Sequence, residues 1–591
     1  MTNATQEINL YRKLLGHLSS TRRRQFGYLT FLMLLASVSE VLSIGMALPF
    51  LSAITQPDVL LKNKYINGVV QYFDIETKNI VLIITVAFIF LVIFSALVRL
   101  SLVFLSTRLS LLAGSDLSCK IFKNVLDQKF TYHAGINSGT LIDVIANKSN
   151  GVIYNVLMPF TSIFSSMLIV VSIVVALMLV DPAVAIITFL GFGGLYGLII
   201  YFTRNRIFQY SGLGAKKSTE VIVCLQESMG GIRDILIDST QETYHHIYKN
   251  IDISLRRAQA GIIFIGSSPK LIVEALAMAL MALIAYQFTK QENSTFGAIA
   301  VLGAFAIGAQ KIIPLLQQSY AAWTCIKGSE QALVEVVQLL DLPTKVVIDR
   351  EQLLFEHDVE FRDVYYSYPN ANKFALESLN IKIKCGEKVG IIGATGCGKS
   401  TFLDLLMGLL EPAKGSYLVD GVFITGRNNS SWQKHIAHVP QSVYLSDASI
   451  AENIAFGVSF EGIDRTRLNL AVKLAQLDDY VGSLPQGLQT LVGERGIRLS
   501  GGQRQRIGIA RALYKQADVL FLDEATSALD SDTERKIMDS IQSLDKAPTI
   551  FMVAHRISTL SSCDRIIELE AGQIKRVCQY SDLKLCEDAQ R

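Results

Sequence analysis

Val389-Gly-Ile-Ile-Gly-Ala-Thr-Gly-Cys-Gly-Lys-Ser-Thr401 is the stretch that decides the fold of the second half of this chain. Its first four residues predict a buried strand, residues 393–400 match the pattern GxxxxGK(S/T), and a helix is expected to begin near Thr401. In a strand–loop–helix setting the glycines let backbone N–H groups close around phosphates, and the helix N-terminus adds favourable charge. The stretch therefore predicts a phosphate-binding loop; the alternative is a bare glycine-rich turn.

The chemistry expected at this loop is that of a nucleoside triphosphate held with a metal ion. Lys399 is placed to pair with the β- and γ-phosphates, and the Ser400 hydroxyl to hold Mg²⁺. Further along, Val519-Leu-Phe-Leu-Asp523 predicts a buried strand that ends in a carboxylate. We expect Asp523 to bind Mg²⁺ through water, and Glu524 to orient or deprotonate the attacking water. ATP and Mg²⁺ are therefore the predicted cofactors.

The composition places the rest of the chain in a membrane. Its 591 residues are 50% hydrophobic and only 18% charged, against roughly 25% charged in ordinary soluble proteins. The mean hydropathy of +0.36 excludes a disordered chain and is too high for a soluble enzyme. The net charge of +3 gives no indication of a nucleic-acid partner. We therefore predict a membrane protein with a soluble part.

The cysteines give no sign of a metal site or a disulfide framework. There are eight of them in 591 residues, without CxxC or Cys/His metal spacing. In the topology derived below they all lie on or near the cytoplasmic side, where thiols stay reduced. We expect them to be packing residues.

Six apolar stretches, each long enough to cross a bilayer core that needs about 20 residues, predict an α-helical membrane domain over residues 1–340. Asp181 with Pro182 predicts a tight turn between the third and fourth spans. The loops 106–150 and 204–260 are rich in Lys and Arg, so these loops and both termini are predicted to be cytoplasmic. The expected spans are about 26–53, 80–105, 153–180, 182–203, 262–287 and 296–324.

The connection between the first two spans is external in this topology. Within residues 58–74, apolar side chains recur at helical spacing with charged residues between them. This pattern predicts a short amphipathic helix in the outer membrane interface. A helix packed against the spans is the alternative, and the pattern leaves both open.

A soluble nucleotide-binding domain is expected over residues 358–580, after a linker at 341–357 and before a tail at 581–591. Its motifs in order are Tyr368, the loop 393–400, Gln441, the signature Leu499-Ser-Gly-Gly-Gln503, Asp523-Glu524, Ser527-Ala-Leu-Asp530 and His555. In these motifs the chain resembles the ATP-binding cassette (ABC) transporters. The resemblance implies an α/β P-loop domain with ATPase activity, fused behind the six long helices of an exporter-type half-transporter.

The resemblance also implies how the motifs work. In the family, two such domains sandwich two ATP molecules, and the phosphate loop of one faces the signature of the other. It follows that Ser500, Gly501 and Gly502 act in trans and that the chain forms a homodimer. His555 is implied to contact the γ-phosphate as a catalytic residue beside Glu524.

The same resemblance supplies two sets of binding residues. The implied metal set is Ser400, Gln441 and Asp523. The implied ATP-binding set is Tyr368, Gly393, Thr395, Gly396, Cys397, Gly398, Lys399, Ser400, Thr401, Gln441, Ser500, Gly501, Gly502 and Gln503.

Three cations inside the predicted spans indicate what kind of cargo is moved. Arg99, Lys270 and Lys311 would each cost about 2.5–3.5 kcal/mol at the centre of a bilayer, so each should face the bundle interior or water. A dimer doubles them around one cavity, which suits a phosphate or diphosphate head group. The alternative is that they form ion pairs with Glu40 or Glu274.

Several stretches outside the soluble domain resemble bacterial flippases of lipid-linked oligosaccharides. These are the first span with Glu40, the external amphipathic helix, Pro269-Lys270 with Glu274, and Lys311-Ile-Ile-Pro314. Where those flippases have Arg-type cations, this chain has Lys270 and Lys311. The resemblance implies ATP-driven flipping of a polyprenyl-diphosphate-linked oligosaccharide across the bacterial inner membrane.

Two other functions stay open on the sequence. One is an exporter of amphipathic drugs, lipids or peptides, which would have a mainly apolar and aromatic cavity. The other is a cassette protein that regulates a partner without moving cargo. An intact Glu524 and His555 argue against the second, because such a protein has no need of ATP turnover.

Overall fold

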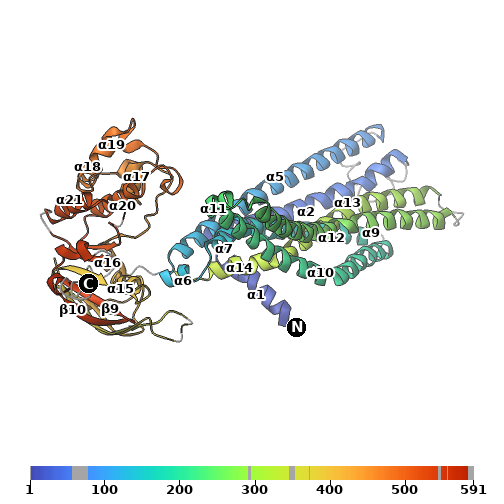
Figure 1. The fold of residues 1–591 in the computed structure, drawn as a ribbon. Coiled ribbons are helices and arrows are strands. Elements are labelled where there is room, and N and C mark those ends of the chain that lie inside the picture. Colours follow the sequence, from blue (N-terminus) through green and yellow to red (C-terminus); the bar gives the residue numbers. More distant parts are fainter. Residues whose placement is uncertain are drawn as a thin grey trace. The chain divides into compact units, whose positions relative to one another are not determined.

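The computed structural model describes residues 2–55, 77–180, 182–289, 295–344, 353–369, 371, 373–526, 528–543, 547–554 and 557–583. The chain divides into two compact units, which are described separately (Figure 1). One comprises Met1–Gln128 and Tyr132–Thr344, and the other comprises Lys129–Thr131 and Lys345–Arg591. The first is built of helices in its described residues, and the second combines helices with two sheets.

Long helices dominate the first unit (Figure 1). They are α2 (Ser20–Thr55), α5 (Thr77–Leu126), α9 (Met158–Val180), α10 (Pro182–Gly230), α12 (Gln241–Thr289) and α13 (Thr295–Gly328). The shorter elements are α1 (Thr2–Gly16), α7 (Ser138–Ile142), η1 (Asp143–Lys148), α8 (Ser149–Val152), η2 (Ile153–Leu157), α11 (Ile232–Ile237) and α14 (Glu330–Leu340). The short helix α6 (Phe130–Ala134) has its first two residues in the second unit and the rest in the first. The segments η1 and η2 are π-helical and interrupt the helix that leads into α9.

The predicted spans overlap the long helices, several of which continue far beyond them. Helices α5, α10 and α12 have 50, 49 and 49 residues, more than twice the ~20 that a bilayer core requires. By length and composition, three described stretches could cross a membrane: Ser20–Met46, Val81–Leu126 and Ser138–Val175. The other spans stay predictions. The proposed outer helix 58–74, the turn at Asp181 and the loop after the fifth span lie outside the described residues.

The long helices expose large apolar side chains instead of covering them. On α5, Phe90, Leu100 and Phe104 are 66%, 66% and 60% exposed. A water-soluble protein avoids such a surface, whereas lipid tails accept it. Inside the bundle, α2 packs on α5 through a core that includes Met33 and Leu102, α10 packs on α12, and α9 packs on α13.

Two sheets organise the second unit. A four-stranded antiparallel sheet has the order β2 (Leu376–Lys384), β1 (Asp358–Tyr366), β4 (Lys414–Val419), β5 (Val422–Phe423). A six-stranded sheet has the order β10 (Gln573–Cys578), β9 (Arg565–Glu570), β3 (Lys388–Ile392), β8 (Thr549–Val553), β7 (Val519–Asp523), β6 (Ile436–Val439), and only β10 runs antiparallel to its neighbour. The helices are α15 (Lys399–Leu406), α16 (Asn429–Lys434), α17 (Ile450–Ile454), α18 (Arg465–Leu474), α19 (Asp478–Ser483), α20 (Gly501–Lys515) and α21 (Ser531–Gln542).

The central strands β3, β8 and β7 read as apolar runs because both faces of a parallel sheet are covered. Between them, Phe521 and Phe551 stack with their ring centroids 4.7 Å apart. Val553 pairs with Ile391 on one side and with Asp523 on the other. The carboxyl ends of β3 and β7 therefore flank that of β8, which is where ligands bind in open α/β sheets.

The soluble core begins before the predicted boundary at residue 358. Leu353 and Phe355 are already buried in it, and Phe355 packs edge-on against Trp432. Part of the predicted linker therefore belongs to the packed domain. Residues 345–352 of that linker, and the tail after residue 583, lie outside the described residues.

Candidate functional site

The loop 393–400 follows β3 directly and runs into α15, as the sequence predicts. Gly393 has φ +153°, and a Cβ there would lie 2.3 Å from the carbonyl oxygen of Leu569. Gly398, the N-cap of α15, has φ +104°, and a Cβ would lie 2.8 Å from Leu376. Both positions require glycine, because the backbone is left-handed and neighbouring atoms leave no space for a side chain. The conformation of the loop therefore depends on glycine at both positions.

Two of the predicted binding side chains, Lys399 and Tyr368, lie at the loop. The Lys399 ammonium donates to the carbonyl oxygens of Gly393 and Ala394, at 2.8 and 3.0 Å, so it lies across the loop where phosphates are expected. Tyr368 comes from the connection between β1 and β2, and its hydroxyl shares a hydrogen bond of 3.0 Å with Thr401. The tyrosine, whose side chain is 42% exposed, offers an aromatic face beside the loop.

Cys397 contributes its backbone to the loop, whereas its thiol belongs to the core. The residue is 7% exposed and lies in the same buried cluster as Phe402. Its N–H donates to Ala394 at 3.2 Å. The packing therefore buries the Cys397 thiol in the core, which makes it less accessible to reagents. Thr395, Gly396 and Ser400 are exposed on the loop.

The carboxylate pair stands at the end of β7. Gln441, just after β6, donates from its side-chain amide to the Glu524 carboxylate at 2.6 Å. Glu524 has φ +50°, a left-handed conformation that costs energy for a residue with a side chain. Its backbone N–H donates to Val553 at 3.0 Å. The direction of the Glu524 side chain is thus set by a strained backbone, which the hydrogen bonds to Val553 and Gln441 hold in place.

Gln505, on α20, is a residue of this site that the sequence analysis missed. It is 5% exposed. Its side-chain oxygen accepts from the N–H of Ala528 at 2.9 Å, and its side-chain nitrogen donates to the carbonyl of Glu524 at 3.4 Å. It therefore joins the signature helix to the strained Glu524 and to Ala528. Gln505 lies four residues before the buried Ile509 and seven before the buried Ala512, so all three lie on one face of α20. This spacing is the sequence signal that could have found it.

Asp404 is the second missed residue. It lies on α15, and burial together with the nearby charge of Asp523 raises the pKa of Asp404 to about 6. Two carboxyl groups this close repel each other when both are ionised, so a divalent cation between them would be stabilised. The hydroxyl of Ser400, the amide of Gln441 and the carboxylate of Asp523 are hard oxygen donors of the kind that Mg²⁺ prefers. The residues present fit the predicted ion.

The signature residues open helix α20. Ser500 is its N-cap, and its hydroxyl accepts from the N–H of Gln503 while the Gln503 side chain accepts from the N–H of Ser500. A Cβ on Gly502 would lie 3.1 Å from the carbonyl oxygen of Ala528. Across the described residues, no hydrogen bond joins this helix start to the loop 393–400. His555 and Ser527 lie outside the described residues.

Two of the three cations predicted to bind a head group, Lys270 and Lys311, have carboxylate partners in the structure. Lys311 on α13 donates to Glu40 at 2.6 Å, and Glu40 also accepts from Ser95 at 2.6 Å. Arg99, on α5, is exposed and lies near enough to attract the Glu40 carboxylate. The carboxylate side chain is only 6% exposed, but that of Lys311 is 42% exposed.

Lys270 has a carboxylate neighbour of its own on α12. Its ammonium lies 3.8 Å from Glu274, four residues later, and the two side chains are 56% and 39% exposed. Such an exposed i,i+4 pair contributes only about 0.3–0.5 kcal/mol. The structure thus places the three cations on three helices and gives two of them ion-pair partners, the alternative that the sequence left open.

Family models match both halves of the chain. The description "ABC transporter transmembrane region" matches residues 25–310, and "ABC transporter" matches residues 376–527. This chain belongs to the ABC transporter family. The predicted fold class, a helical transmembrane domain followed by an α/β P-loop domain, is confirmed. As an ABC transporter it is a membrane protein that binds ATP and acts as an ATPase.

The chain is similar to several named proteins. An ATP-dependent lipid A-core flippase of Paraburkholderia xenovorans is 29% identical over 475 residues, covering 79% of this chain and 78% of that one. A lipid A-core flippase of Burkholderia orbicola is 32% identical over 62% of this chain and 61% of that one. The chloroplastic ABC transporter B family member 29 of Arabidopsis thaliana is 33% identical over 54% of this chain and 50% of that one.

A solved structure shares the fold of the ABC transporter described here. It is a bacterial Atm1-family ABC exporter with ATP bound, with a TM-score of 0.79, 22% sequence identity and 96% of both chains covered. At this identity the likeness establishes the exporter fold and no more.

Proposed function

We propose that this ABC transporter is a homodimer that flips a lipid with a phosphate-bearing, glycosylated head group across the bacterial inner membrane, driven by ATP. The specific cargo that we propose is a polyprenyl-diphosphate-linked oligosaccharide. Relatives named as ATP-dependent lipid A-core flippases support a lipid as the class of cargo. The observation that carries the proposal is the arrangement of Lys311, Glu40 and Arg99.

In that arrangement the buried Glu40 carboxylate acts as an anchor. It accepts from Lys311 and Ser95, while 42% of the Lys311 side chain stays exposed. An ammonium group has three donors, and Glu40 occupies one of them in this structure. Lys311 can therefore offer its remaining donors to an anion, and Arg99 adds a guanidinium that takes phosphate oxygens in pairs. A diphosphate would find both cations on helices that pack against α2, near Glu40.

The arrangement of the nucleotide site supports the proposed homodimer. In the described residues the start of α20 makes no hydrogen bond with the loop 393–400, so the signature of the same chain does not complete the site. A second copy supplying Ser500, Gly501 and Gly502 would complete it, as the resemblance implies. The exposed apolar helices support insertion in a bilayer, and the basic loops 106–150 and 204–260 support a cytoplasmic soluble domain.

Each residue of the site then has a task in hydrolysis. Lys399 and the N–H groups of the loop hold the phosphates, and Tyr368 stacks on the adenine. Ser400, Gln441 and Asp523 would hold Mg²⁺, which would supply positive charge beside the phosphates. Glu524 orients a water molecule and takes its proton. Water adds to the terminal phosphorus, the bond to the β-phosphate oxygen breaks, and ADP and phosphate leave.

Lipid A-core glycolipid is a second candidate cargo, because the relatives are named for it. A lipid A-core glycolipid carries phosphates and sugar on several acyl chains, whereas the proposed cargo carries a diphosphate on one polyprenyl chain. The cations Arg99 and Lys311 would serve both head groups. The two cargoes are therefore separated by experiment and not by the charges.

The experiment measures how each cargo changes ATPase activity in proteoliposomes. We expect polyprenyl-diphosphate-linked oligosaccharide to stimulate the wild type, and the variant Glu40→Gln/Lys311→Gln to lose that stimulation. The double variant is chosen because Lys311→Gln alone strands a buried carboxylate, at about 3–5 kcal/mol. Lys217→Gln, which removes a lysine of the basic loop after the fourth predicted span, is the control. Stimulation by lipid A-core glycolipid alone, or by an amphipathic drug alone, would overturn the proposed cargo.

A further inference from the structure

A buried ion cluster lies among the helices of the first unit, apart from the nucleotide site and the cations discussed above. Lys148 is 4% exposed and Asp143 is 0% exposed. The Lys148 ammonium lies 3.3 Å from Asp143 and 2.5 Å from Glu335, and it donates to the hydroxyl of Thr219 at 2.8 Å. Asp143 accepts further from Ser218 and Thr219, at 3.0 and 2.9 Å. Every partner is thus satisfied.

The cluster joins three separate elements at one point. Asp143 and Lys148 begin and end the π-helical segment η1, Thr219 is on α10, and Glu335 is on α14. Taking charges out of water is expensive, so a buried ion cluster serves to specify one arrangement better than to add stability. Here the arrangement specified is the position of α14 against η1 and α10. Among the described residues, helix α14 is the last element before the nucleotide-binding domain.

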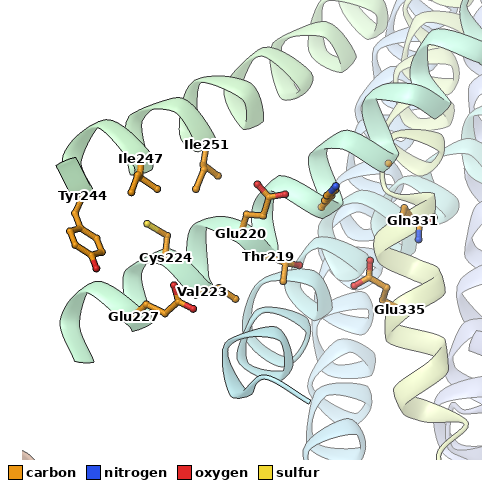
Figure 2. Close-up of a pocket in the computed structure, with 12 residues that line it drawn as sticks. Thr219, Glu220, Val223, Cys224, Glu227, Tyr244, Ile247, Ile251, Gln331 and Glu335 are labelled. Carbon is orange, nitrogen blue, oxygen red and sulfur yellow. The ribbon is translucent and has the colours of Figure 1, made fainter. Parts of the chain in front are cut away.

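One member of the cluster has room to move. Glu335 is 27% exposed, and with Thr219 it lines a cavity of about 860 Å³ between α10, α12 and α14 (Figure 2). Figure 2 shows Glu335 and Gln331 on α14 at one end of this cavity, with Tyr244 and Glu227 at the other. The Glu335 side chain can therefore leave Lys148 and enter the cavity without displacing packed atoms.

A second cation, Lys216, lies at the same cavity. Lys216 also lines it, one helical turn before Glu220 on α10. Its side chain is exposed, and within the described part of the chain it makes no ion pair or hydrogen bond. Its neighbour Lys217, by contrast, pairs with Glu220 at 2.5 Å. Lys216 is thus a cation without a carboxylate, on the wall that Glu335 shares.

We propose that Glu335 is a two-position carboxylate that couples α14 to α10 in the transport cycle. In this structure it pairs with Lys148. In the other state it pairs with Lys216, while Asp143 keeps the Lys148 charge neutralised. The exchange costs no unpaired buried charge in either position, because Lys148 retains Asp143 and Glu335 gains Lys216. It gives α14 two discrete registers against α10, as a two-state element requires.

The test is a double-mutant cycle on ATP turnover by the full-length protein, which needs no cargo and so is independent of the proposed substrate. Glu335→Gln and Lys216→Gln are each expected to lower kcat by about 3- to 10-fold, within the range of coupling seen for such elements. The KM for ATP and the melting temperature should stay unchanged, because neither residue touches nucleotide and Lys148 keeps Asp143. Lys217→Gln is the matched control and should leave kcat unchanged.

The double variant Glu335→Gln/Lys216→Gln decides the question. If the two residues act as one pair, it turns over ATP at the rate of either single variant. Multiplied losses would show two independent effects and overturn the proposal, as would a Lys216→Gln variant with the kcat of the wild type. Should Glu335→Gln lose stability, Lys216→Gln still tests the second position, since it leaves the Lys148–Glu335 pair intact.

Discussion

The side-chain amide of Gln441 donates a hydrogen bond of 2.6 Å to the carboxylate of Glu524. The two residues follow different strands, β6 and β7, which are neighbours in the sheet. The residue predicted to reach the metal ion therefore also holds the residue predicted to serve the attacking water. This bond holds the Glu524 carboxylate, and the backbone of Glu524 is itself strained.

The first prediction concerns Glu524. Glu524→Gln should lower ATP turnover by about 10²- to 10⁴-fold, the usual contribution of a general base, because the amide cannot take a proton. Nucleotide binding should persist, and ATP should stay trapped in a dimer. The measurement is steady-state ATPase activity together with retained labelled ATP. Turnover near the wild-type rate would assign the base elsewhere.

The second prediction concerns Gln505. Gln505→Ala removes the acceptor of the Ala528 N–H, at about 0.5–1.5 kcal/mol, and frees the backbone of Glu524. We expect kcat to fall about tenfold while the KM for ATP changes little. Gln505→Glu, which still accepts from Ala528 but cannot donate to Glu524, should give an intermediate rate. Gln542→Ala, at an exposed position of α21, is the control. Equal kinetics for all variants would contradict the role.

The third prediction concerns thiols. Burial, with the charge of Asp564 beside it, raises the pKa of Cys563 to about 12, and Cys397 is 7% exposed. Because the thiolate is the reacting form, both should label slowly with a maleimide at pH 7.5, whereas the exposed Cys119 labels fast. Mass spectrometry of labelled peptides gives the rates, and denaturant should abolish the differences. Rapid labelling of Cys397 that ATP prevents would mean that its thiol faces the nucleotide.

The fourth prediction concerns pH. The pKa of Asp404 is about 6 in the folded protein, above its ordinary 3.8, so the folded state keeps a proton that the unfolded chain releases. Stability is therefore highest below about pH 4 for this group and is lost as the pH rises through 6. The two-unit shift would give about 3 kcal/mol, reduced to about 1–2 kcal/mol because the carboxyl is only partly buried.

Replacing that carboxyl tests the sign. Asp404→Asn should raise the melting temperature at pH 7.5 in EDTA and flatten its dependence between pH 5 and 7. Asp539→Asn, at an exposed position of α21, should change neither. If Asp404→Asn instead lowered the melting temperature at pH 7.5, the ionised carboxylate would be contributing stability and the sign would be wrong.

The local parts of the nucleotide site could be predicted because their signals are contiguous. A buried strand, glycines at fixed spacing and a helix start specify the loop 393–400 within thirteen residues. The contact of Gln441 with Glu524, by contrast, joins residues 83 apart through a sheet order that no short pattern records. Gln505 was missed because a polar residue inside a helix is normally expected to face solvent. Only the packing of its neighbours shows that it is buried.

The charges of the helical unit show the same limit. Lys148 and Asp143 fall in a stretch rich in Lys and Arg, which composition marks as a solvated loop, yet the fold buries them against α10 and α14. The sequence offered ion pairing of Lys311 with Glu40 as an alternative to free cations, and choosing between them needs the packing of α2 on α13. Burial is a property of the assembled helices, and spacing along the chain does not contain it.

The flipping of lipid in sealed proteoliposomes tests the proposed function most directly. Fluorescent polyprenyl-diphosphate-linked oligosaccharide is placed in both leaflets, and its accessibility to an impermeant quencher is followed after ATP is added. We predict ATP-dependent movement of the lipid by the wild type and none by Glu524→Gln, with phosphatidylcholine of the same label left in place. ATP hydrolysis by the wild type without any movement of the diphosphate-linked glycan would contradict the account.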